Sequence, residues 1–137
     1  MADTTRYFNS PSVGLNNVGS YQVSGVPFIT GSNTIPVDTE DKITFPMVAR
    51  NVTVVNHGAE VIRVHFNSMT DTTVITNFHF VELDSDEDSI SMSVKCKEIY
   101  ISTPATNVNP GNYRVIAELT QISTDRMYVL TGSGLTD

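Results

Sequence analysis

The stretch SISMSVKCKEIYIS, Ser89–Ser102, contains the pattern that decides the fold. Apolar and polar side chains alternate along its first part, as in a β-strand with one buried face. The apolar positions of this first part are Ile90, Met92, Val94 and Cys96. The apolar positions then become Ile99 and Ile101, so the alternation shifts by one residue near Lys97-Glu98. Because one extra residue exchanges the two faces of a strand, the shift predicts a β-bulge or a strand corner.

The rest of the chain shows short β-branched runs separated by Gly, Pro, Asn, Asp and Ser, which favour turns. Strands are expected at Tyr21–Val23, Ile43–Met47, Val52–Asn56, Val61–Asn67, Phe78–Leu83, Ile90–Cys96, Glu98–Ser102, Tyr113–Gln121 and Met127–Leu130. The segment VTVVNHGAEVIRVHF is expected to form a hairpin around Asn56-His57-Gly58-Ala59. No long helical stretch is present to connect parallel strands. We therefore predict a single all-β domain over residues 20–137, either an antiparallel β-sandwich or a jelly roll.

The N-terminal part of the chain differs in composition, because no charged residue occurs from Tyr7 to Val37. Residues 1–19 are expected to form an extended N-terminal arm that binds along the surface of a partner. Its candidate anchors are the isolated apolar residues Tyr7, Phe8, Val13 and Leu15. A loose N-terminus followed by an ordinary first strand is the alternative, and the sequence does not separate the two.

The acidic segment before Ser89 is the nearest approach to a site motif. Asp84, Asp86 and Asp88 match the first three ligand positions of an EF-hand calcium loop. The match then fails, because Ser89 replaces the turn glycine and Lys95 replaces the closing glutamate. We interpret the segment as a solvated turn, with a calcium site of another kind as the alternative.

Charge and cysteine content argue against several classes of function. The 137 residues carry a formal net charge of −7 with only eight Lys and Arg, which argues against nucleic-acid binding. No apolar run is long enough to span a membrane, and Met1–Ser10 lacks the pattern of a secretion signal. The single cysteine, Cys96, excludes an internal disulfide and is expected to be a buried structural thiol.

The sequence contains no motif that predicts an enzyme or a cofactor. His57 is expected in a turn, His65 on an exposed strand face, and His79 between Phe78 and Phe80. No two histidines have the close spacing that would begin a zinc site. A nucleophile elbow and a phosphate-binding loop are both absent. We therefore expect a protein without catalytic residues.

Three stretches resemble small virion structural proteins of tailed bacteriophages, and most closely their head decoration (cement) proteins. They are GSYQVSGVPFITGSNT, VKCKEIYIST and DRMYVLTGSGLTD. The resemblance implies a β-sandwich or jelly roll, often a homotrimer, that binds the major capsid protein and stabilises the assembled shell. It further implies synthesis in the host cytoplasm and a final location on the capsid surface.

Two other functions fit the same sequence. The first is a tail or neck component of the virion, which shares β folds with decoration proteins. The second is a jelly-roll adhesin that binds glycans, which a calcium site at Asp84–Asp88 and exposed aromatic side chains would favour. The chain has five tyrosines but no tryptophan for sugar stacking.

Overall fold

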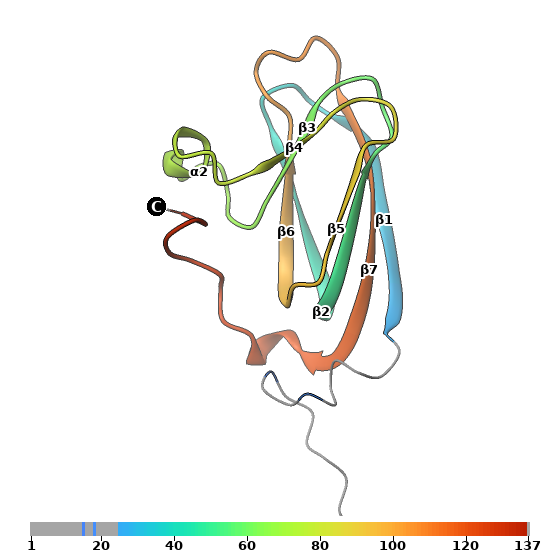
Figure 1. The fold of residues 1–137 in the computed structure, drawn as a ribbon, viewed down its shortest axis with the longest axis vertical. Coiled ribbons are helices and arrows are strands. Elements are labelled where there is room, and N and C mark those ends of the chain that lie inside the picture. Colours follow the sequence, from blue (N-terminus) through green and yellow to red (C-terminus); the bar gives the residue numbers. More distant parts are fainter. Residues whose placement is uncertain (1–14, 16–17, 19–24, 137) are drawn as a thin grey trace, which may run out of the picture.

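Figure 1 shows the computed structural model of the chain, in which residues 15, 18 and 25–136 are described. The strands form one hydrogen-bonded series in the order β1-β7-β2-β6-β3-β4, with β5 paired to β2, and every pair is antiparallel. The elements are β1 Val26–Ile35, β2 Glu40–Asn56, β3 Ile62–His65, α2 Thr72–Thr76, β4 Val81–Leu83, β5 Ser89–Met92, β6 Cys96–Ser102, β7 Gly111–Ser123 and the 3-10 turn η1 Thr124–Arg126.

Strand β2 belongs to both halves of the sheet. Its residues 40–44 pair with β6, whereas residues 51–56 lie alongside β7, and residues 52–55 also pair with β5 on the opposite edge. The registers with β6 and β7 both shift between Thr44 and Asn51, where Pro46 lies. Proline has no N–H for a ladder, so a change of partners is a suitable place for it. One half is therefore β1-β7-β2-β5 and the other is β2-β6-β3-β4.

The two halves pack against each other around one core. Phe28 of β1 and Phe45 of β2 meet edge to face, with ring centroids 5.6 Å apart, although they lie in different halves. Ile43, Val54 and Ile99 belong to the same buried cluster. The predicted all-β sandwich is confirmed, while the jelly-roll alternative and the N-terminal arm stay predictions.

The predicted change of strand parity is confirmed. Residues Cys96, Ile99 and Ile101 are buried, and the register shift between Thr44 and Ala49 lies opposite Cys96–Glu98. The Cys96 thiol is fully buried as expected, and burial raises its pKa to about 12.

The predicted hairpin between Val52–Asn56 and Val61–Asn67 is wrong. Strand β2 uses both of its edges there, for β7 and β5, so β3 pairs with β6 and β4 instead. The expected strands at Ile43–Met47 and Val52–Asn56 are parts of the single strand β2.

Other strand predictions also need correction. The stretch Met127–Leu130 is not a strand, and β1 was not anticipated. The expected strand Tyr21–Val23 lies outside the described residues.

Candidate functional site

The acidic segment is an ordered turn. Asp86 and Glu87 have left-handed backbone angles, φ 66° and 73°. The Asp88 carboxylate accepts hydrogen bonds from the backbone N–H groups of Asp84, at 2.9 Å, and Ser89, at 3.0 Å. This carboxylate therefore closes the turn.

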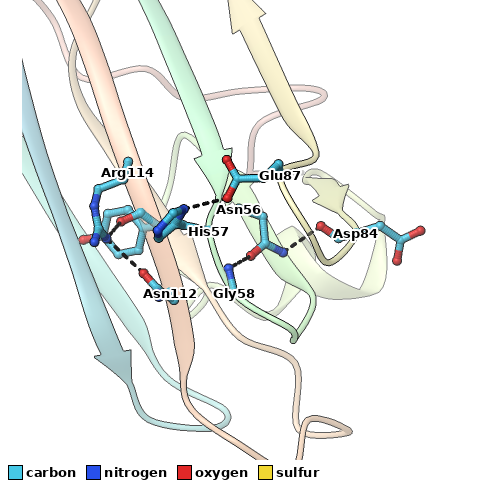
Figure 2. Close-up of polar contacts among 8 residues, drawn as sticks. Asn56, His57, Gly58, Asp84, Glu87, Asn112 and Arg114 are labelled. Atoms are coloured by element: carbon cyan, nitrogen blue, oxygen red, sulfur yellow. Dashed lines mark hydrogen bonds and ion pairs between the residues drawn. The ribbon is translucent and has the colours of Figure 1, made fainter.

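The three aspartates considered for calcium do not converge. In Figure 2 the Asp84 carboxylate points away from the neighbouring polar groups. Within residues 15, 18 and 25–136, the structure brings together no group of three His, Cys, Asp or Glu side chains that could hold a metal ion. We therefore interpret the segment as a turn.

Asn56 fastens this turn to the end of β2. The side chain is fully buried, and its amide nitrogen lies 2.7, 3.1 and 2.8 Å from the carbonyl oxygens of Glu60, Leu83 and Asp84. Its amide oxygen accepts the N–H of Gly58 at 3.1 Å, as Figure 2 shows. A single amide thus supplies partners for the backbone groups of two loops. By contrast, the adjacent His57–Glu87 pair, 2.6 Å apart, is exposed to solvent.

His65 is buried, so the prediction that it lies on an exposed face is wrong. Its ring is 1% exposed and stacks on Tyr100, with centroids 5.8 Å apart. Nδ1 lies 2.6 Å from the carbonyl oxygen of Asn67 and therefore carries the proton, while Nε2 accepts the Ser102 hydroxyl at 2.8 Å. The polar side chains of His65 and Ser102 can both be buried because they form a hydrogen bond with each other.

A serine–histidine pair of this length resembles the pair that activates a nucleophile. Ser102 and His65 are each only 1% exposed, so a substrate carbonyl cannot reach the hydroxyl in this conformation. The pair therefore serves packing in the structure as it stands. The absence of catalysis stays a prediction.

The burial of His65 predicts a dependence of stability on pH. Burial lowers the pKa of His65 below its ordinary value of 6.5, so the unfolded chain binds the proton more readily than the folded chain. The contribution of His65 is fully present above pH 6.5 and decreases as the pH falls below it, by up to about 1.4 kcal/mol per pH unit. Urea unfolding between pH 7 and 5 should show this slope.

The comparison is between the wild type and His65→Gln. We expect His65→Gln to flatten the slope between pH 6.5 and 5, because the titrating group is gone. Equal slopes in the wild type and His65→Gln would show that another group is responsible.

His79 lies in the loop between α2 and β4, near His65. It borders a cavity of about 240 Å³ whose wall includes Phe66, Phe78, Phe80, His65 and Leu135. Phe78 is 78% exposed and has an unusual left-handed backbone, φ 60°. The C-terminal segment thus reaches the loop between α2 and β4, in agreement with Figure 1.

One side of the half β1-β7-β2-β5 is exposed or partly exposed to solvent, and we call it the outer face. Its central row is Ile29, Ile116, Thr53 and Ser91, which lie side by side in register. The hydroxyl oxygens of Thr53 and Ser91 are 2.9 Å apart, and in the next row Asn51 donates to Ser93 at 3.2 Å. The outer face comprises Ile29, Asn51, Thr53, Ser91, Ser93 and Ile116, and the same side of β7 carries the charged residues Arg114 and Glu118 in the two flanking rows. The ion pair of Arg50 and Glu118, 2.6 Å apart, borders it.

Of the four predicted anchors, only Leu15 lies within the described residues. Leu15 packs against a small buried cluster of this same domain, formed by Val48, Ile122 and Met127. Tyr7, Phe8 and Val13 lie outside the described residues. The sequence analysis missed the outer face, although the serines that alternate in SISMSV were a signal for it.

Comparisons of the chain with protein-family models, with curated proteins and with solved structures return no match. Among the described residues, no helix has both the length and the apolar character needed to cross a membrane.

Proposed function

We propose that this chain is a non-enzymatic decoration protein, which binds the assembled major capsid protein shell of a bacteriophage and stabilises it. The observation that carries the proposal is the central row of the outer face, Ile29, Ile116, Thr53 and Ser91, which is uncharged on a protein of net charge −7. Short hydroxyl and amide side chains beside Ile29 and Ile116 can approach another protein closely.

The proposed stabilisation follows from mass action. A ligand that binds the assembled shell better than its separate subunits shifts the equilibrium toward the shell. The residues Tyr7, Phe8 and Val13 would extend this contact along the capsid protein. Leu15 packs on the domain itself, so it is a less suitable anchor than the other three.

The test is cosedimentation of the purified chain with assembled capsids. We expect Thr53→Arg to weaken binding about tenfold or more, because it places a large charge in the central row of the outer face. Val108→Arg is the matched control, since Val108 is 83% exposed in the loop between β6 and β7. Wild-type affinity of Thr53→Arg would overturn the assignment of the outer face.

The copy number in purified virions tests the proposed location. A decoration protein should be present in numbers comparable to the major capsid protein. A few copies per particle would instead favour a tail or neck component. Absence from the particles would contradict both functions.

A further inference from the structure

Strand β1 has one edge that no described strand occupies. It pairs with β7 along one side only. The orientation of its backbone follows from β7: the Asn112 carbonyl accepts the N–H of His57 at 3.0 Å and so faces β2. Backbone groups alternate in direction along a strand, so the N–H and C=O groups of the next residue, Tyr113, point to β1. Tyr113 is in register with Ser32, and therefore Ile29 and Gly31 direct their N–H and C=O groups to the unoccupied edge.

The position of Pro27 agrees with this orientation. Pro27 lies two residues before Ile29, so its backbone nitrogen and carbonyl group are directed to the same edge. Proline is tolerated in an edge strand where its missing N–H faces away from the partner strand. The backbone of β1 can thus pair with β7 and still offer donors and acceptors to another strand.

The other edge strands are better protected against further pairing. Strand β4 has three residues and β5 has four, and both flank the acidic turn. Strand β1 has ten residues and no charge, whereas edge strands are usually short, charged or covered. Its outward side chains include Ile29, 69% exposed, directly beside Ile116, 43% exposed.

We propose that the occupant of this edge is β1 of a second copy of the chain, paired antiparallel about a two-fold axis at Thr30. Each Ile29 then lies opposite Gly31 of the second copy, where their backbone groups form hydrogen bonds in both directions. A large side chain is thereby matched with a glycine.

Two further observations favour a second copy as the occupant. The Arg114 side chain lies over Gly31, because a Cβ on Gly31 would be 2.7 Å from Arg114 Cδ. The aliphatic part of Arg114 would therefore cover Ile29 of the second copy. Strand β1 has no charged residue, so pairing at this edge sets no carboxylate of one acidic molecule (net charge −7) opposite a carboxylate of the other.

The pairing also has a geometric consequence. Residues directly opposite in an antiparallel pair point to the same side of the sheet. The outer faces of the two copies would therefore lie side by side and face the same direction. The inference rests on β1 and the neighbouring strand β7, and it does not require the proposed function.

The first test is sedimentation velocity of the full-length protein. We expect the wild type to be a dimer at tens of micromolar, with Ile29→Lys raising its dissociation constant about tenfold or more. Val108→Lys should remain a dimer, which controls for the added charge. A monomeric or trimeric wild type, or an Ile29→Lys variant that dimerises normally, would overturn the inference.

The second test is a disulfide across the proposed axis. The two Thr30 residues would form a pair without mutual hydrogen bonds, with Cα atoms about 4.5 Å apart, which a disulfide can span. We expect Thr30→Cys to give a covalent dimer under mild oxidation and Val108→Cys to give little. Cys96 is buried and does not compete. Failure of Thr30→Cys to cross-link above the Val108→Cys level would exclude this axis.

Discussion

Asn56→Ala is expected to lower the free energy of unfolding by about 3–4 kcal/mol. The substitution removes the amide that contacts the carbonyl oxygens of Glu60, Leu83 and Asp84 and the N–H of Gly58. Buried backbone groups left without partners cost about 1–3 kcal/mol each, and water can reach only some of them after local relaxation. Urea unfolding followed by far-ultraviolet circular dichroism measures the loss.

The adjacent residue supplies the control for Asn56. His57→Ala removes an ion pair with Glu87 in which both side chains are about half exposed. Exposed pairs contribute less than about 1 kcal/mol, so this variant should unfold almost as the wild type does. Similar losses in both variants would mean that the buried amide is not what holds the acidic turn.

The sequence predicted the features of the fold that depend on neighbouring residues. The parity change at Lys97-Glu98 is visible in the sequence because alternation is a local property. Which strands pair is not local, and the predicted hairpin failed for that reason. Strand β2 continues past Pro46 and changes its partner there, whereas the sequence suggested two separate strands.

The alternation of apolar and polar residues also could not predict which polar residues are buried. His65 alternates with apolar residues, and this pattern predicted an exposed side chain. Both of its ring nitrogens instead form hydrogen bonds inside the protein, one with the Ser102 hydroxyl and one with the Asn67 carbonyl. Strand β1 was missed because glycine, proline and asparagine interrupt its alternation. The outer face appears only when β1, β7, β2 and β5 are placed in register.

Phe45→Ala is expected to have an effect of about 3–5 kcal/mol on the free energy of unfolding. Phe45 is 1% exposed and belongs to the core between the two halves of the sandwich. Truncation removes the apolar transfer energy of the ring and leaves a cavity that the strands can close only in part. Phe78→Ala is the matched control, because the same change at a 78% exposed ring should cost less than about 1 kcal/mol. If the two variants lost equal stability, Phe45 could not lie in a packed core.

A double-mutant cycle tests the contact between the halves more directly. Phe28 meets Phe45 at an interplanar angle of 88°, an edge-to-face geometry that contributes about 0.5–1.5 kcal/mol beyond area burial. Once Phe45 is alanine, this contact no longer exists to be lost. The cost of Phe28→Ala should therefore be smaller in the Phe45→Ala background by that amount. Strict additivity would show that the rings do not interact, and β1 would then be held by β7 rather than by packing across the sandwich.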